Sequence, residues 1–255
     1  MIEIWDVTLP ELTGEEERRA YIYLPQAAEY DEELRFPVLY MFDGQNVFFD
    51  EDATYGKSWG LGEYLDVNQT PLIVAAVECN QHPDDSRLSE YAPYSASSRM
   101  FGTIEGRGPL TMDWLIHSFK PEIDRCYPTK SDRRHTFIAG SSMGGLMSLY
   151  AVSCFNGVFS RAAALSPSLG FGAKSLEAMT READIAPDTV LYMDMGEEEL
   201  GWRSTAHNFR RFGRLLLERG VNLTARIVPG GQHCEASWEK QIPFFVPTLL
   251  YDLEE

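Results

Sequence analysis

The chain has 255 residues and is strongly acidic: 39 aspartate and glutamate residues oppose 22 lysine and arginine residues, for a formal net charge of -17. Single α/β domains of this length are common, so we expect residues 1–255 to form one domain. The charge argues against nucleic acid or an anionic membrane as a partner, because both would be repelled. No run approaches the ~20 apolar residues of a membrane-spanning helix, and the acidic N-terminus does not fit a signal peptide. We therefore expect a soluble, cytoplasmic protein.

Apolar runs rich in β-branched and aromatic residues recur along the chain and indicate strands. In chain order they are 21–24, 37–43, 71–78, 135–139, 162–165, 189–193 and 223–228. Amphipathic stretches predict helices over 110–127, 144–153, 204–219 and 235–251. This alternation indicates an α/β fold with a mostly parallel central sheet and helices on both faces. Since no helix separates the first two runs, we expect them to form an antiparallel hairpin at the sheet edge.

One long irregular segment, residues 80–108, interrupts the alternation. Loops of this length inside α/β domains are more often functional insertions than spacers, so we predict that it forms a wall of a substrate pocket. The four cysteines are scattered, without metal-ligand spacing, and are predicted to be free thiols. Cys79, Cys126 and Cys154 are expected to be buried, whereas Cys234 adjoins the candidate site. No metal or organic cofactor is implied.

The pentapeptide Gly140–Gly144 (GSSMG) fits the pattern G-x-S-x-G. It follows the apolar run HTFIA and precedes a predicted helix, which is the strand-turn-helix context of a nucleophilic serine. At such a turn the serine adopts a strained backbone, and small neighbours relieve the crowding. Ser142 is therefore the candidate nucleophile, although a glycine-rich turn without chemistry would share the pattern.

A serine hydroxyl needs a base within hydrogen-bond reach, normally a histidine held by a carboxylate. In this architecture the histidine comes last in the chain, and only His207 and His233 follow Ser142. His207 falls inside the predicted helix 204–219, whereas His233 follows the last strand in a loop with two glycines. His233 is therefore the predicted base.

The orienting carboxylate should follow the strand at 189–193. Four of the six residues from Asp194 to Glu199 are acidic, which is also what a solvated acidic loop looks like. Glu199, three residues past a glycine, is our first choice. Asp194 and Glu198 remain competitors.

An oxyanion hole requires two preorganised N–H donors. One is expected from the residue after the nucleophile, Met143, and the other from the loop after the strand at 37–43. In that loop Gly44 is expected to permit the backbone that turns the N–H of Gln45 inward. Asp43 is expected to brace the loop rather than react.

Several segments occur in the same order in one known family. They are MFDGQNVF, KSWGLGEYL, VECN followed by RLSEYAPY, FKPEIDRCYPT, IAGSSMGGLMSLYA, LSPSLGF and GGQHCEASWEKQIPFFVPTLL. On these segments the chain resembles the esterase D-like "putative esterase" branch of the α/β hydrolases. The branch is similar to feruloyl and acetylxylan esterases, enterochelin esterases, S-formylglutathione hydrolase and the mycolyltransferases. The resemblance extends from about residue 37 to residue 250 and implies the α/β-hydrolase fold.

The resemblance also implies roles for individual residues. Ser142 would be the nucleophile, His233 the base and Glu199 the acid, and the amides of Gln45 and Met143 would form the oxyanion hole. Some siderophore esterases of this branch work with a displaced or missing acid.

Two further positions have competing interpretations. Trp59 lies where the family often has an aromatic side chain near the substrate pocket, but packing of a core tryptophan is about as well supported. Arg87, Glu90 and Tyr91 would either bind substrate or, as we favour, include an Arg87–Glu90 pair that pins the long loop.

The leading hypothesis is a serine carboxylic-ester hydrolase that acts on a small ester, such as a carbohydrate acetyl or feruloyl ester. The alternatives are a siderophore trilactone esterase of the enterochelin type, an acyltransferase, and a non-catalytic binding module on the same fold. The expected partner is the small-molecule ester, and a homo-oligomer remains compatible with the sequence.

Overall fold

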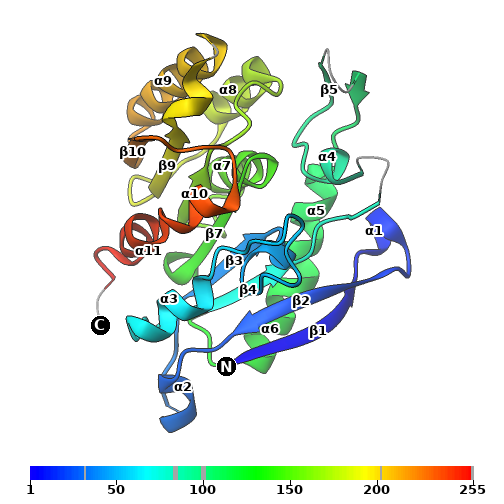
Figure 1. The fold of residues 1–255 in the computed structure, drawn as a ribbon, viewed down its shortest axis with the longest axis vertical. Coiled ribbons are helices and arrows are strands. Elements are labelled where there is room, and N and C mark those ends of the chain that lie inside the picture. Colours follow the sequence, from blue (N-terminus) through cyan, green and yellow to red (C-terminus); the bar gives the residue numbers. More distant parts are fainter. Residues whose placement is uncertain (32, 83–85, 99–101, 202, 254–255) are drawn as a thin grey trace.

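The computed structural model describes residues 1–31, 33–82, 86–98, 102–201 and 203–253. Its centre is a twisted eight-stranded sheet, and a two-stranded hairpin lies apart from it (Figure 1). The strands are β1 (Ile2–Thr8), β2 (Glu17–Tyr23), β3 (Val38–Phe42), β4 (Ile73–Val77), β5 (Ala96–Ser98), β6 (Gly102–Ile104), β7 (Thr136–Ser141), β8 (Arg161–Leu165), β9 (Val190–Gly196) and β10 (Asn222–Val228).

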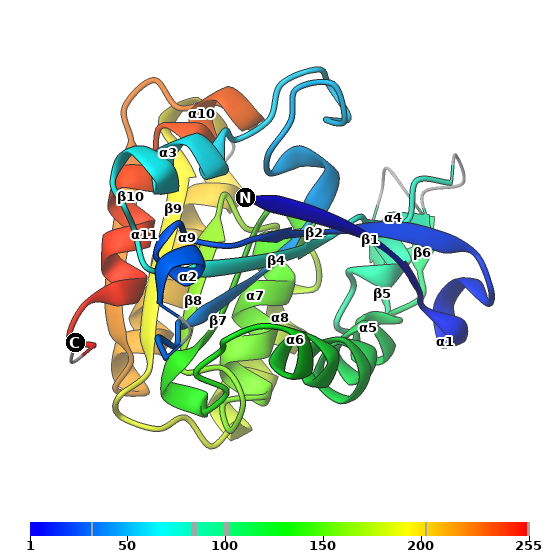
Figure 2. The same ribbon diagram turned by 90° about the horizontal axis from the view of Figure 1, so that it is seen from below.

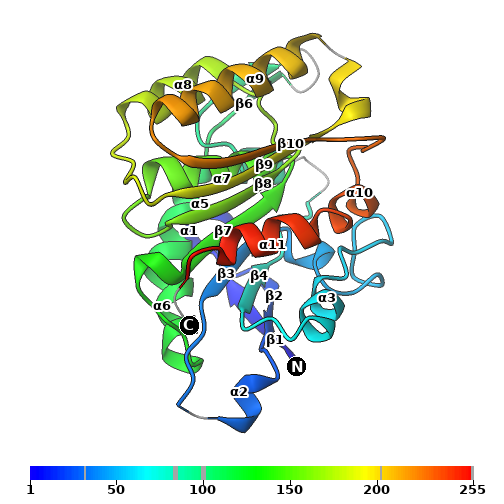
Figure 3. The same ribbon diagram turned by 90° about the vertical axis from the view of Figure 1, so that its left-hand side faces the viewer.

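Helices cover both faces of the sheet (Figures 2 and 3). They are α1 (Pro10–Thr13), α2 (Ala27–Tyr30), α3 (Leu61–Val67), α4 (Ser86–Glu90), α5 (Gly108–Trp114), α6 (Lys120–Cys126), α7 (Met143–Cys154), α8 (Ala173–Glu182), α9 (Arg203–Glu218), α10 (Glu235–Glu239) and α11 (Ile242–Leu250). A π-helical segment, Leu115–Phe119, joins α5 to α6. None of the described helices is both long and apolar enough to cross a membrane.

The strand order in the large sheet is β1-β2-β4-β3-β7-β8-β9-β10. From β4 to β10 the neighbouring strands are parallel, whereas β2 is antiparallel to both β1 and β4. The hairpin predicted from residues 21–24 and 37–43 is therefore wrong. The antiparallel hairpin pairs β2 with β1, and the parallel strand β4 lies between β2 and β3.

Each buried strand contributes side chains to two separate hydrophobic cores, because successive residues point to opposite faces. In β3, Tyr40 and Phe42 belong to the core under α5, α7, α8 and α9, whereas Leu39 and Met41 belong to the core under α3 and α11. Burial on both faces explains why these strands appear in the sequence as continuous apolar runs.

Two predicted segments differ in detail. The helix predicted over residues 235–251 is two helices, α10 and α11, because Pro243 in the first turn of α11 favours a helix start there. The segment 80–108, predicted to be irregular, contains α4 and the hairpin β5–β6. Residues 83–85 and 99–101 of this segment lie outside the described residues.

Candidate active site

Ser142 lies in the tight turn between β7 and α7, at the carboxyl edge of the sheet. Its backbone has φ 57° and ψ -118°, a conformation that residues other than glycine rarely adopt. The turn is also crowded, since a Cβ at Gly140 would come within 2.7 Å of the carbonyl carbon of Gly144. The two glycines of G-x-S-x-G therefore make room for the strained serine.

Three side chains that are far apart in the sequence meet at this turn. The Oγ of Ser142 lies 2.9 Å from Nε2 of His233, and Nδ1 of His233 lies 2.6 Å from Oε2 of Glu199. A carboxylate only accepts hydrogen bonds, so Nδ1 carries the proton and Nε2 is left to accept from the serine hydroxyl. The other candidate, His207, lies exposed on α9.

Glu199 is held by donors on its second oxygen. Oε1 accepts hydrogen bonds from the hydroxyl of Ser166 at 2.6 Å and from the backbone N–H of Gly196 at 2.9 Å. Burial raises the pKa of a carboxyl group, but the hydrogen bonds from His233 and Ser166 outweigh it and lower the pKa of Glu199. Glu199 is therefore a carboxylate at neutral pH with a fixed orientation.

Sequence reasoning missed Ser166. Its hydroxyl also accepts a hydrogen bond from Nε1 of Trp238 at 3.1 Å, so it connects α10 to Glu199. The residue follows β8 directly, and that position was its only signal. At the carboxyl end of a parallel strand next to β9, a hydroxyl is well placed to contact residues of the site.

Glu197 and Glu198, which directly precede Glu199, form hydrogen bonds to the loop that carries His233. Glu197 accepts from the N–H of Gly230 at 3.0 Å, and Glu198 accepts from the side-chain amide of Gln232 at 2.7 Å. The backbone N–H of Glu198 also donates to the carbonyl of Gly231. This acidic cluster is therefore a brace for residues 230–232 rather than a purely solvated surface.

Asp194, a competitor for the acid, lies inside β9 because that strand continues to Gly196 instead of ending at residue 193. Its carboxyl is buried, with 1% of the residue exposed, and accepts from the N–H of Ser166 and the hydroxyl of Tyr192. Burial raises the pKa of Asp194 to about 7. The side chain shapes the turn at Ser166 and does not contact His233.

The raised pKa of Asp194 predicts a pH-dependent stability. The folded protein favours the neutral carboxyl, so this stabilising contribution is complete below pH 4 and is lost as the pH rises to about 7. Relative to Asp194→Asn, which does not titrate, the wild type should lose up to about 4 kcal/mol of unfolding free energy between pH 4 and 8. Urea unfolding of both proteins at four pH values measures this difference. A constant difference would contradict the assignment.

The loop after β3 is the segment in which an oxyanion-hole donor was predicted. The unusual backbone conformation was predicted for Gly44, but it is Asp43, the preceding residue, that adopts the left-handed conformation, with φ 59°. Gly44 is required by a close approach, because a Cβ there would lie 2.7 Å from the carbonyl carbon of Val77. Within the described chain, the backbone N–H groups of Gln45 and Met143 have no backbone acceptor. Gln45 lies in the 3-10 turn Gly44–Asn46 and Met143 in the first turn of α7, where N–H groups have no partner within the helix.

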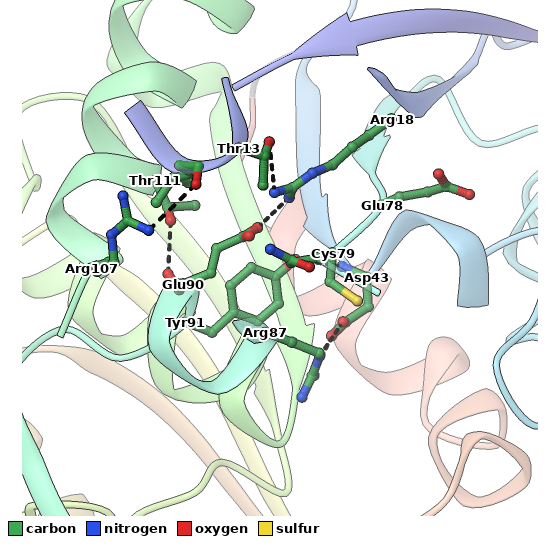
Figure 4. A network of polar contacts seen from close by, with 12 residues as sticks. Thr13, Arg18, Asp43, Glu78, Cys79, Arg87, Glu90, Tyr91, Arg107 and Thr111 are labelled. Atoms are coloured by element: carbon green, nitrogen blue, oxygen red, sulfur yellow. Dashed lines mark hydrogen bonds and ion pairs between the residues drawn. The ribbon is translucent and has the colours of Figure 1, made fainter. Parts of the chain in front are cut away.

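A partly buried ion pair fixes this loop (Figure 4). Arg87 on α4 donates from Nε and Nη2 to the two carboxylate oxygens of Asp43, at 2.6 and 2.7 Å. The hydroxyl oxygen of Tyr91 accepts a hydrogen bond from the backbone N–H of Asp43 at 3.2 Å. Glu90 pairs with Arg18 at 2.6 Å, so the predicted Arg87–Glu90 pair is wrong. The bidentate contact ties the segment 80–108 to the oxyanion loop.

A cavity of about 640 Å³ opens above Ser142 and His233. Residues 80–82 together with Arg87 and Leu88 form part of its wall, so the pocket wall predicted for the segment 80–108 is found only in its first part. The described residues of the hairpin β5–β6 do not line this cavity. Trp59 does not line the cavity: it is 3% exposed and packs against Trp238 and Phe245. Its position matches the core-packing interpretation, because the indole fills the space beneath α10 and α11.

The cysteines differ from the expectation of three buried thiols. All four are free, but Cys126 and Cys154 are exposed. Cys79 is buried at the cavity wall, where it lies 3.1 Å from the side-chain amide of Gln45, and burial raises the pKa of its thiol. In the described part of the chain, no three histidine, cysteine or acidic side chains are arranged to hold a metal ion.

Known structures share this architecture. A protein called BES from Bacillus cereus is 18% identical, with a TM-score of 0.72 over 96% of this chain and 94% of that one. A ferulic acid esterase is 17% identical, with a TM-score of 0.72 over 98% and 97%. The enterobactin and salmochelin hydrolase IroE is 21% identical, with a TM-score of 0.65 over 94% and 93%. The predicted α/β-hydrolase fold is thereby confirmed.

Sequence comparison gives a consistent result. The uncharacterized protein YbbA of Bacillus subtilis (strain 168) is 24% identical over 193 residues, which cover 71% of this chain and 69% of that protein. The model of the family described as "Putative esterase" matches residues 12–249, nearly the whole chain. The chain therefore belongs to the Putative esterase family and is an ester-hydrolysing enzyme.

Proposed function

We propose that this enzyme cleaves carboxylic esters through a catalytic triad of Ser142, His233 and Glu199. The observation that carries the proposal is the unbroken hydrogen-bond chain from hydroxyl to imidazole to carboxylate, at 2.9 and 2.6 Å. These distances lie within the range in which a base can take the proton of a nucleophile. The strained serine at the start of α7 supports the same role.

The reaction then follows from the geometry. The Oγ of Ser142 attacks the ester carbonyl while Nε2 of His233 takes the hydroxyl proton, and Glu199 stabilises the imidazolium. The N–H groups of Gln45 and Met143 donate to the tetrahedral oxyanion. The carbon–oxygen bond to the alcohol breaks as His233 returns its proton to the leaving oxygen, which leaves an acyl-serine. Water attacks this acyl-enzyme in the same way and releases the acid.

The proposed substrates are small polar esters, such as a carbohydrate acetyl or feruloyl ester. Amide and hydroxyl side chains of Asn46, Thr54, Asn80 and Gln81 line the cavity, which favours a substrate with several polar groups. The structural similarity to a ferulic acid esterase is compatible with this choice. A siderophore lactone is the alternative, since the neighbours also include siderophore hydrolases.

The proposal predicts a common acyl-enzyme. With p-nitrophenyl acetate and phenyl acetate in the presence of methanol, the ratio of methyl acetate to acetic acid should be the same for both esters, because the same acetyl-serine partitions between methanol and water. A fluorophosphonate probe should stop hydrolysis and give one adduct, at Ser142. Different ratios for the two esters, or an adduct on another serine, would contradict the mechanism.

A further inference from the structure

Glu235 is a buried carboxyl in the active-site cavity that the proposed mechanism does not use. It begins α10, two residues after His233, and lines the same cavity as Ser142. Only 6% of the residue is exposed. Among the described residues, the hydrogen bond recorded for this carboxyl comes from its own backbone N–H. No side chain of the described chain donates to it.

Glu235 has no role as an alternative acid. Both ring nitrogens of His233 are already engaged, Nδ1 by Glu199 and Nε2 by Ser142. Arg87 interacts with Glu235 through its charge, but its Nε and Nη2 both donate to Asp43. Among the described residues, this carboxyl therefore has a donor in its own backbone N–H but none in a side chain.

A carboxylate can accept several hydrogen bonds, so a largely buried one with a single backbone donor keeps an unmet cost of desolvation unless a further donor reaches it from the cavity. We propose that Glu235 accepts a hydrogen bond from a hydroxyl group of the bound ester and selects hydroxyl-bearing substrates. This inference rests on the proposed esterase function and specifies its substrate class. The donor that we assign is a neutral hydroxyl, because the cation that acts on the charge of Glu235, Arg87, is already present and is paired with Asp43.

Two matched pairs of esters test the selection. Butyl acetate and 4-hydroxybutyl acetate differ by a hydroxyl on the alcohol; p-nitrophenyl butyrate and p-nitrophenyl 3-hydroxybutyrate differ by one on the acyl group. In at least one pair, the wild type should show about a 10- to 100-fold higher kcat/KM for the hydroxylated ester, the discrimination expected of a hydrogen bond to a charged group. Glu235→Leu should bring that ratio close to one.

A control variant separates this effect from a general effect of α10. Glu239→Gln alters a partly exposed carboxylate at the other end of the same helix, which pairs with Lys57, and should keep the wild-type ratio. If Glu235→Leu does not fold, Glu235→Gln decides the matter: its weaker acceptor should lower the ratio at least threefold, with circular dichroism as the check on folding.

Three results would overturn the inference. They are a wild-type ratio near one in both pairs, a ratio that the Glu235 variants leave unchanged, and a preference for acetylcholine over 4-hydroxybutyl acetate. Failure of the wild type to hydrolyse any of these esters would instead contradict the proposed function itself.

Discussion

Ser142→Ala should abolish ester hydrolysis, with kcat on p-nitrophenyl acetate falling by about 10⁶-fold, as when the nucleophile of a serine triad is removed. Alanine retains the Cβ, so the strained turn at φ 57° keeps its shape and the folded state is preserved. KM should change little compared with kcat, because the hydroxyl reacts but does not hold the substrate. Steady-state kinetics and a thermal melt of the two proteins measure both effects.

Ser168 supplies a matched control. Its hydroxyl lies 3.4 Å from that of Ser142, and its backbone N–H donates to the Ser142 carbonyl, a bond that a side-chain change leaves intact. Ser168→Ala should therefore retain kcat within about threefold, as expected for a residue outside the reacting group. Loss of activity in Ser168→Ala together with retained activity in Ser142→Ala would reverse the assignment of the nucleophile.

Local patterns made the proximity of Ser142 and His233 predictable. The turn at Ser142 is a short-range feature, because its glycines, preceding strand and following helix are contiguous in the sequence. His233 followed from elimination, since only two histidines come after the serine and one lies on a helix. The parallel strands were also predictable, because burial on both faces makes each of them a continuous apolar run.

Long-range contacts could not be predicted in the same way. The edge strand β1 lacks the continuous apolar run used to predict the other strands; the near-alternation of apolar and polar residues in IEIWDVT is the weaker signal that could have found it, and its pairing with β2 comes only from the structure. The partners of Arg87 and Glu90 come from segments 44 and 72 residues away. Nothing in the local sequence distinguishes these ion pairs from the expected Arg87–Glu90 contact.

The choice among the acidic residues also depended on tertiary structure. Glu199 meets His233 because the hydroxyl of Ser166, from the neighbouring strand, fixes its second oxygen. Asp194 is buried because β9 extends to Gly196, three residues beyond the apolar run 189–193. Neither fact can be read from six residues of which four are acidic.

Glu199→Gln should have the second largest effect, with kcat lower by about 10⁴-fold, as when the orienting acid of a triad is replaced by its amide. The amide nitrogen can donate to Nδ1 of His233, which places the imidazole proton on Nε2 and leaves no lone pair to accept from Ser142. The loss should appear in kcat with a small change in KM. Kinetics with p-nitrophenyl butyrate at pH 7 to 9 measure it.

Two neighbouring carboxylates separate this tautomer effect from a general loss of negative charge. Glu198→Gln keeps an oxygen that can accept from Gln232, and Asp194→Asn keeps one that can accept from the N–H of Ser166. Glu198→Gln removes one formal charge near Glu199, and Asp194→Asn removes one at pH 8 to 9, above the pKa of about 7 of that carboxyl. Both variants leave Nδ1 of His233 bonded to Glu199, so each should lower kcat by less than about tenfold. A larger loss of kcat in Asp194→Asn than in Glu199→Gln would assign the acid to Asp194 instead. Equal losses in all three variants would indicate that the total charge of the loop, rather than the contact with Glu199, supports His233.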